Sequence, residues 1–209
     1  MITRIREVAQ LERLLGVETG VDAKRVLRLV AESGALLRGH FGLQSGAHSS
    51  YFLRFRAIGW EPELLEDVVE LLVERAELRE ARVNVLCAES AAFALAQRVA
   101  ETTTNSLVVV ALDRRRRPTK ELRSGAVVQG APSVIVSDIL TTGESLRPLV
   151  ELAPPPAEVL AFASRLSQPP PEGVTRVTAL VRPLWESVAK ENCDMCRAEA
   201  PLIPAAELN

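Results

Sequence analysis

The stretch Val134-Ile-Val-Ser-Asp-Ile-Leu-Thr-Thr-Gly-Glu-Ser-Leu146 decides the fold of this chain. The run from Ser133 to Val136 is rich in β-branched residues and predicts a short strand that is buried on both faces. Asp138 falls at the carboxyl end of that strand, which is where ligands sit in open α/β sheets. From Glu144 onward, apolar residues recur at helix spacing. A strand, a small-residue turn and a helix in this order direct free backbone N–H groups at an anion.

The turn between the predicted strand and helix carries the groups that a phosphate requires. Its hydroxyl groups supply further donors, and its glycine lets the backbone approach an anion closely. The predicted phosphate-binding residues are therefore Thr141, Thr142, Gly143, Glu144 and Ser145. An ordinary strand–helix turn, in which the aspartate and threonines only cap the helix, is the alternative interpretation.

The same stretch resembles the phosphoribosyl pyrophosphate motif of the type I phosphoribosyltransferases. That motif has four apolar residues, two acids, two apolar residues, Thr-Thr-Gly, any residue, and then Ser or Thr. The chain matches it except at Ser137, which stands at the position of the first acid. The resemblance implies an α/β fold, with a mostly parallel five-stranded sheet, helices on both faces and a small N-terminal hood. We expect one domain over residues 1–209, with the hood in residues 1–58 and a tail in residues 183–209.

The bulk properties of the chain exclude several classes of protein. A chain of 209 residues is long enough for one sizeable core. The formal net charge of −2 argues against a general nucleic-acid binder, and no apolar run reaches membrane-spanning length. The first residues lack the apolar core of a signal peptide, and an odd count of three cysteines argues against a secreted disulfide framework. We therefore expect a cytoplasmic protein with no nucleic-acid or membrane partner.

Periodicity predicts the remaining elements. Residues 1–37 look helical, with Asp22 as the N-cap of a second helix. Residues 35–58 are typical of short strands joined by tight turns. Beyond them the pattern predicts helices at 61–78 and 91–100, buried strands at 83–87, 106–112 and 157–164, and an outer strand at 174–181.

A second stretch, Gly34 to Leu53, is similar to the substrate hood of the orotate phosphoribosyltransferases. It shares their Gly-Ala-Leu opening, a Ser-Gly turn and a Tyr-Phe pair, in the same order and with similar spacing. The similarity implies that Gln44, Tyr51 and Phe52 contact the base, although the family has Lys at the first of these positions. Arg165 follows a predicted strand, where the orotate enzymes present an Arg to the substrate carboxylate. A β-hairpin with routine turn chemistry is the alternative interpretation.

Two further segments occupy positions where the family binds pyrophosphate. The first is the loop Ala88-Glu89-Ser90, which is followed by Ala91 where the orotate enzymes have a Lys. The second is the basic run 113–125, and such runs are most often solvated loops. The resemblance instead implies a mobile lid, since concentrated positive charge suits a multiply charged leaving group. The expected cations of this lid, which lacks the family's His, are Arg114, Arg115 and, in poorer register, Lys120.

The resemblance implies a glycosyltransferase that moves the ribosyl 5-phosphate group of phosphoribosyl pyrophosphate to a nucleobase, most closely orotate, with Mg²⁺. Breaking the anomeric bond creates positive charge on the sugar and a highly charged leaving group, so the protein mainly positions and stabilises charge. The expected catalytic residues are Asp138, Arg114, Arg115 and Lys120. A lid acting across an interface suggests a homodimer. Because Ser137, Gln44, Ala91 and the missing His each remove a charged or proton-transferring group, a weak or inactive regulatory protein that binds phosphoribosyl pyrophosphate or a nucleotide is the alternative.

The tail contains Cys193-Asp-Met-Cys196, a spacing that could supply half of a zinc site. Four ligands are normally required, the sequence has no second cysteine pair, and His40 and His48 lie in the hood. A metal shared between two chains and an exposed redox pair are open alternatives. We favour a structural or incidental role, and expect neither cysteine to be needed for ligand binding or turnover.

Overall fold

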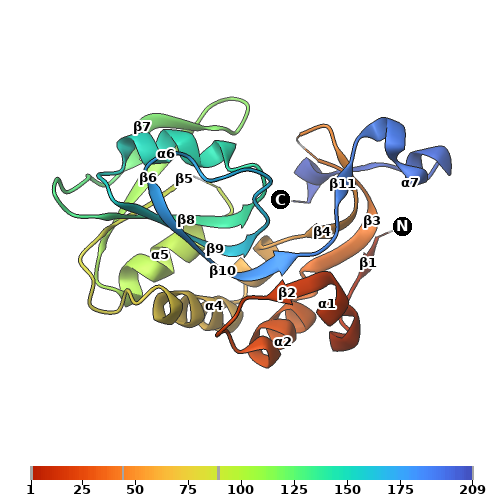
Figure 1. Ribbon diagram of the computed structural model, residues 1–209, viewed down its shortest axis with the longest axis horizontal. Coiled ribbons are helices and arrows are strands. Elements are labelled where there is room, and N and C mark those ends of the chain that lie inside the picture. Colours follow the sequence, from red (N-terminus) through yellow and green to blue (C-terminus); the bar gives the residue numbers. More distant parts are fainter. Residues whose placement is uncertain (1, 44, 89, 209) are drawn as a thin grey trace.

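The computed structural model describes residues 2–43, 45–88 and 90–208, which form two lobes that each contain one β-sheet (Figure 1). The larger lobe contains the middle of the chain, and the smaller lobe joins the N-terminal segment to the C-terminal tail. Among the described residues, none of the helices is long and apolar enough to span a membrane.

The larger lobe is built on a seven-stranded sheet whose central strands run parallel to one another. In spatial order its strands are β2 (Leu15–Val17), β10 (Val174–Pro183), β9 (Ala157–Ser164), β8 (Ser133–Leu140), β5 (Asn84–Ala88), β6 (Ser106–Leu112) and β7 (Pro118–Ser124). The predicted mostly parallel α/β sheet is confirmed, and all five of its predicted strands beyond the hood are present.

Both edge strands are antiparallel and were not predicted. β2 comes from a segment expected to be helical, and β7 comes from the basic run expected to be a loop or lid. β2 pairs with β10, so the prediction of β10 as the outer strand is wrong by one position. Edge strands depend on a neighbour for their hydrogen bonds, which is why local periodicity predicts them poorly.

Alternation along the buried strands sends side chains into two separate cores. In β5, Val85 and Cys87 join a core with α4 (Pro62–Arg75) and α5 (Phe93–Thr102), whereas Leu86 joins a second core with α6 (Arg147–Leu152). In β8, Val134 and Ile135 divide in the same way. Helices therefore cover both faces, as expected for strands that are buried on both sides.

The N-terminal segment alternates between strand and helix, which corrects the expectation of a largely helical region. β1 (Thr3–Arg4) and β2 flank α1 (Val8–Leu14), and α2 (Ala23–Ser33) follows. The predicted N-cap is confirmed, because the Asp22 side chain accepts a hydrogen bond of 3.1 Å from the N–H of Arg25. Gly34 ends α2 with a φ of 59°.

The hood is a second sheet, formed by β1, β3 (Leu36–Gly42), β4 (His48–Leu53) and two short strands of the tail. β11 (Ser187–Val188) pairs with β4, and β12 (Ile203–Pro204) pairs with β3. The N-terminal segment alone therefore does not make the hood. The remaining short helices are α3 (Arg56–Gly59), α7 (Asp194–Arg197), η1 (Glu144–Leu146), η2 (Lys190–Asn192) and η3 (Ala205–Glu207).

Candidate functional site

The candidate site lies at the carboxyl edge of the large sheet, where β8 and β5 end side by side. The chain moves from β5 to β6 in one direction across the sheet, whereas β8 and β9 lie on the other side of β5. Such a reversal opens a crevice at the carboxyl ends of the two strands, and ligands of open α/β sheets bind there. The turns that follow β8 and β5 are thus placed at one location.

The turn after β8 has free backbone donors and a glycine that the conformation requires. Gly143 has a φ of 74°, and a Cβ at this position would lie 3.2 Å from Cδ2 of Leu166. Within the described part of the chain, the N–H groups of Thr142 and Gly143 make no hydrogen bond. Thr142 Oγ1 accepts a weak hydrogen bond of 3.4 Å from the N–H of Glu144. Free N–H groups beside exposed hydroxyls form a suitable cradle for an anion.

A second wall of this cradle comes from the segment after β9. The N–H of Ser167 donates to the carbonyl oxygen of Thr141 at 3.0 Å, which holds the two segments together. The pocket between them has a volume of about 100 Å³ and is lined by Thr142, Gly143, Glu144, Arg147, Ser167, Gln168, Pro169 and Pro171.

Arg147 is a pocket residue that the sequence reasoning missed. It is exposed, and no ion pair is found for it among the described residues. The helix that it begins, α6, has six residues and follows the single 3-10 turn η1. A helix this short contributes little macrodipole. The anion-binding capacity of the turn therefore rests on its N–H groups, its hydroxyls and this guanidinium.

Asp138 lies in β8, two residues before the strand ends, and is half-buried. Burial raises the pKa of its carboxyl above the ordinary value, and hydrogen bonds from the backbone N–H groups of Ile139 and Asp138 itself oppose that effect only in part. No cation pairs with it in the described part of the chain. Ser137 precedes it, so the site has one acid where the resembled motif has two.

The turn after β5 is the expected pyrophosphate loop. Ala88 is the last residue of β5, and Ser90 uses its Oγ to accept a hydrogen bond of 3.3 Å from the N–H of Ala92. The side chain of Ser90 is thus engaged at the start of α5. Glu89 lies outside the described residues. Ala91 is half-buried and brings no charge to this turn.

The basic run forms a hairpin rather than an irregular loop. Asp113 organises the turn between β6 and β7, because its carboxylate accepts hydrogen bonds of 2.8 Å from the N–H groups of Arg115 and Arg117. These contacts, chiefly the one from the Arg117 N–H, lower the pKa of Asp113. The side chains of Arg114 and Arg115 are exposed, and no ion pair to another described residue is found for either. Two guanidinium groups are therefore available at the carboxyl edge of the sheet.

Lys120 does not join the cations of the hairpin turn. It lies on β7, where its ammonium pairs with Glu151 of α6. At the base of the same hairpin, Gly125 has a φ of 80°, and a Cβ there would collide with the carbonyl oxygen of Leu107. The hairpin thus has its glycine at one end and its free arginines at the other.

The hood residues that we expect to contact the nucleobase lie on two different faces of the hood sheet. Tyr51 and Phe52 are neighbours on β4, so their side chains leave opposite faces of the sheet. Tyr51 lies with its ring centroid 5.6 Å from that of Trp185, while Phe52 lies 5.6 Å from Phe41. The two rings therefore lie on opposite faces of β4, and their contact with one base stays a prediction. Gln44 lies outside the described residues.

The tail brings two unpredicted residues to this part of the hood. Trp185 contacts Tyr51, and the next residue, Glu186, accepts a hydrogen bond of 2.9 Å from Nη2 of Arg165. Arg165 is held at the end of β9 by the bond of its N–H to the carbonyl oxygen of Leu140, at 2.9 Å. A guanidinium and an aromatic ring thus lie near the carboxyl edge of the large sheet, with the tail connecting them.

The two tail cysteines do not form an exposed redox pair. Cys193 is 4% exposed and Cys196 is half-buried. Both lie next to His40 and His48 of the hood within the same chain, which the sequence reasoning did not foresee. Cys87 is elsewhere in the core, where burial in apolar surroundings raises its pKa to about 12 and disfavours the reactive thiolate.

Comparison with known proteins identifies the family. No family model matches the chain. An orotate phosphoribosyltransferase of Thermus thermophilus is 31% identical over 189 residues, covering 85% of this chain and 97% of the relative. The crystal structure of an orotate phosphoribosyltransferase from Aeropyrum pernix superposes with a TM-score of 0.53 at 20% identity, covering 85% of this chain and 90% of that one.

An adenine phosphoribosyltransferase from Trypanosoma brucei, solved with AMP, pyrophosphate and ribose-5-phosphate, superposes equally well. Its TM-score is 0.54 at 15% identity, and the match covers 76% of this chain and 80% of that chain. The two structures show a shared fold and do not distinguish a pyrimidine from a purine acceptor. The sequence relationship, together with the fold, shows that this chain belongs to the orotate phosphoribosyltransferase family.

Proposed function

We propose that this protein transfers the ribosyl 5-phosphate group of phosphoribosyl pyrophosphate to orotate or a related pyrimidine, with release of pyrophosphate, in pyrimidine nucleotide synthesis. The observation that carries the proposal is the turn after β8, whose N–H groups at Thr142 and Gly143 make no hydrogen bond to the described residues and which follows Asp138 along the chain. Its sequence order, Asp followed by Thr-Thr-Gly, is the one that the family uses for this substrate.

In this proposal each part of the site handles one charge of the reaction. The turn Thr141–Ser145 anchors the 5′-phosphate, and Arg147 adds a cation that stands beside it in the pocket. Asp138 accepts hydrogen bonds from the ribose hydroxyls and stabilises the positive charge that grows on the sugar. Fixing the sugar between these groups places its anomeric carbon against the base, so positioning supplies much of the rate enhancement.

The donor set suits Mg²⁺ as the cofactor. Mg²⁺ in such sites is held by one or two carboxylates together with substrate phosphates and water. Asp138 is a half-buried carboxylate for which no cation is found among the described residues, and burial raises its pKa, so a cation would relieve an existing electrostatic penalty. The ion would neutralise charge on the leaving pyrophosphate.

Arg114 and Arg115 are the proposed closing cations. Their guanidinium groups are exposed at the hairpin turn, so they can meet a pyrophosphate without first breaking an ion pair. Lys120 would need to leave Glu151 before it could take part. We extend the proposal to a cytoplasmic homodimer in which this hairpin reaches a neighbouring site, with phosphoribosyl pyrophosphate and a nucleobase, rather than a nucleic acid or a membrane, as its partners.

A weak or inactive relative that binds the same substrate as a regulator is the second candidate. It is favoured by the uncharged Ser137 and Ala91 and by the absence of His from the hairpin. At each of these positions the chain lacks a group that, in the resembled family, would carry charge or a proton near the pyrophosphate.

The deciding experiment measures pyrophosphate release with Mg²⁺ and phosphoribosyl pyrophosphate, using orotate, uracil, hypoxanthine and adenine at equal concentration. We expect orotate to be the preferred acceptor. Preference for a purine would refute the acceptor while leaving the transferase in place. If no pyrophosphate is released with any of the four bases, but calorimetry shows tight binding of phosphoribosyl pyrophosphate, the regulatory protein would be favoured.

Arg165→Ala is expected to impair acceptor use and to leave phosphoribosyl pyrophosphate binding unchanged. A planar guanidinium donates two parallel hydrogen bonds to a carboxylate, and Glu186 already holds the Arg165 group in place at 2.9 Å. Charged hydrogen bonds of this kind are each worth about 1.5–3 kcal/mol, so KM for orotate should rise by roughly 10- to 100-fold.

The matched control for this variant is Arg176→Ala. Arg176 also pairs with a glutamate, Glu158 at 2.8 Å, but it lies near the start of β10, at the opposite edge of the sheet. Steady-state kinetics with each substrate varied in turn should leave this control close to the unaltered protein. An equal rise of KM in both variants would mean that loss of a surface ion pair, and not loss of the acceptor contact, is being measured.

A further inference from the structure

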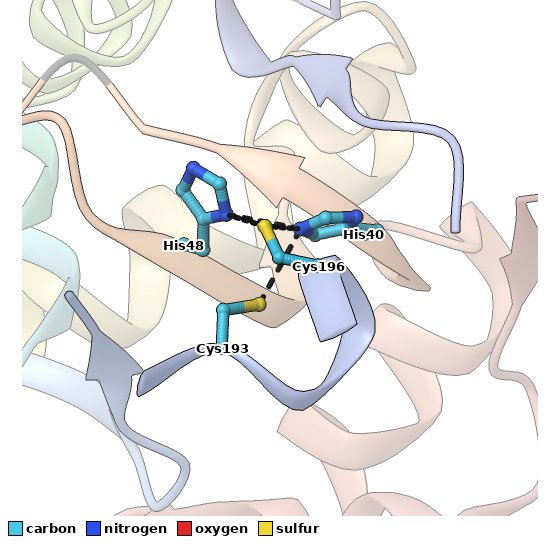
Figure 2. A group of neighbouring side chains, drawn as sticks. All are labelled: His40, His48, Cys193 and Cys196. Carbon is cyan, nitrogen blue, oxygen red and sulfur yellow. Dashed lines mark hydrogen bonds between the residues drawn. The ribbon is translucent and has the colours of Figure 1, made fainter. Parts of the chain in front are cut away.

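The hood and the tail bring four metal-ligating side chains to one point. His40 comes from β3 and His48 from β4, Cys193 is the N-cap residue of α7, and Cys196 lies within α7. Their ligand atoms all lie within 4.8 Å of one another, and Figure 2 shows the four side chains directed toward a common centre. The sequence separations of 145 to 156 residues between the histidines and cysteines hide this group from any local motif.

The distances among the four ligand atoms are close to those of a tetrahedral zinc site, and two of them, both to Nδ1 of His48, are shorter. Zn–S bonds of about 2.3 Å and Zn–N bonds of about 2.0–2.1 Å at tetrahedral angles separate ligand atoms by about 3.3–3.8 Å. Here Nε2 of His40 lies 3.0 Å from Nδ1 of His48, 3.4 Å from Sγ of Cys193 and 3.6 Å from Sγ of Cys196. Sγ of Cys196 lies 3.2 Å from Nδ1 of His48.

Hydrogen bonding fixes His40 in the form that binds a metal. Its Nδ1 lies 2.9 Å from the carbonyl oxygen of Ala200, which can only accept, so Nδ1 carries the proton. In the neutral ring, Nε2 then carries a lone pair that points toward the ligand atoms of His48, Cys193 and Cys196. A carbonyl that orients a histidine through its second nitrogen is typical of metal sites.

A single cation explains the convergence better than hydrogen bonds within the group. One lone pair on Nε2 has one direction, yet three atoms approach it at 3.0 to 3.6 Å. His40, His48 and Cys193 are each at most 5% exposed, so water cannot readily satisfy them. Two thiolates and two neutral imidazoles around a divalent ion carry no net charge, which suits a buried position.

We propose that one Zn²⁺ binds within a single chain to the four side chains His40, His48, Cys193 and Cys196. Two thiolates and two imidazoles at tetrahedral spacing select zinc among the common divalent metals, and four protein ligands leave no open position for catalysis. The site is structural. It fastens α7 to the hood between β11 and β12, each of which pairs with the hood through two residues. Pairings this short would not hold the tail by themselves.

The first test is the metal content of the full chain, purified without chelator and measured by mass spectrometry. We expect one zinc per chain. A metal shared between two chains would give one zinc per two chains and would overturn the single-chain site. Absence of bound metal after incubation with Zn²⁺, or an oxidised Cys193–Cys196 pair in the isolated protein, would overturn the proposal altogether.

The second test compares cysteine variants, with Cys87→Ala as the matched control because Cys87 lies in the core of the other lobe. Cys196→Ala, which alters the most exposed of the four ligands, should lose most of the bound zinc, whereas the control should retain it. Co²⁺ loaded into the metal-free protein should give thiolate-to-metal absorption that Cys196→Ala lacks. Unchanged zinc or cobalt binding in Cys196→Ala would contradict the site.

The third test uses stability, so that it does not depend on a variant that fails to fold. Removing the metal from the unaltered chain with a chelator should lower its melting temperature, and adding Zn²⁺ should restore it. Phosphoribosyl pyrophosphate binding at the Thr141–Ser145 turn, which lies on the other sheet, should survive metal removal. A melting temperature that is indifferent to chelator would show that the tail does not depend on zinc.

Discussion

Gly143→Asp is expected to abolish phosphoribosyl pyrophosphate binding, with a loss of affinity of at least about 100-fold, or roughly 2.7 kcal/mol. Gly143 has a φ of 74° in a buried position of the turn, and its added Cβ would lie 3.2 Å from Cδ2 of Leu166. The new carboxylate would occupy the cradle and repel the 5′-phosphate. Aspartate tolerates left-handed backbone better than most residues, so the fold should survive.

Calorimetric titration with phosphoribosyl pyrophosphate and Mg²⁺ measures this loss, and Gly130→Asp is its matched control. Gly130 has a φ of 83°, so the same substitution meets the same backbone restriction there. No atom lies within 4 Å of the position of its Cβ among the described residues, and the residue is near the amino end of β8, away from the turn. The control should bind normally. Undiminished binding by Gly143→Asp would place the substrate elsewhere and refute the proposed site.

The turn proposed to bind phosphate could be located from the sequence because all of its determinants are local. Thr141 to Ser145 are contiguous, the strand before them is a run of β-branched residues, and the glycine position follows from the turn itself. The parallel sheet was predictable for a similar reason, since strands buried on both faces are continuous apolar runs such as Ser106–Leu112.

The proposed acceptor side of the site is harder to predict from the sequence, because it depends on contacts between distant segments. Trp185 and Glu186 reach Tyr51 and Arg165 only when the tail crosses the hood. No periodicity marks these two residues in the sequence. Tyr51 and Phe52 are adjacent in the sequence, but their side chains leave opposite faces of β4, which the motif alone does not indicate.

The cysteine pair is the clearest case of a site that depends on contacts between distant segments. Cys193 and Cys196 read as half a metal site, and the missing half stands on β3 and β4 of the same chain. The two histidines lie on the paired strands β3 and β4, and nothing in their spacing indicates a metal. Only the pairing of the short strands β11 and β12 with the hood brings the halves together.

Asp138→Asn is expected to lower turnover by about 100- to 1000-fold, the usual effect of removing one group that stabilises a charged transition state. The amide keeps an oxygen that can accept the N–H hydrogen bond of Ile139, so the strand should be unaltered. It cannot offset positive charge on the sugar. Steady-state kinetics with orotate should show the loss mainly in kcat, with affinity for phosphoribosyl pyrophosphate reduced less.

The same substitution should stabilise the folded protein, and this stabilisation should depend on pH. Because burial raises the pKa of Asp138, the folded state binds the proton more tightly than the unfolded state does. The charged carboxylate then destabilises the unaltered protein as pH rises through the interval between the ordinary aspartate pKa and the raised one. The Asp138→Asn variant lacks that penalty, so its gain in melting temperature should be full above the raised pKa and should disappear below the ordinary aspartate pKa. Each kcal/mol of relief corresponds to a gain of about 2–4 °C.

Asp113→Asn provides a control of opposite sign for the stability measurement. Hydrogen bonds from the hairpin, chiefly from the N–H of Arg117, lower the pKa of Asp113, so its ionised form stabilises the fold above the ordinary aspartate pKa. That variant should melt at a lower temperature than the unaltered protein at neutral pH, and the difference should shrink as pH falls through the lowered pKa. An Asp138→Asn protein that melts below the unaltered chain at neutral pH would show that the carboxylate supports the fold. The proposal that Asp138 is a destabilised group kept for the reaction would then fail.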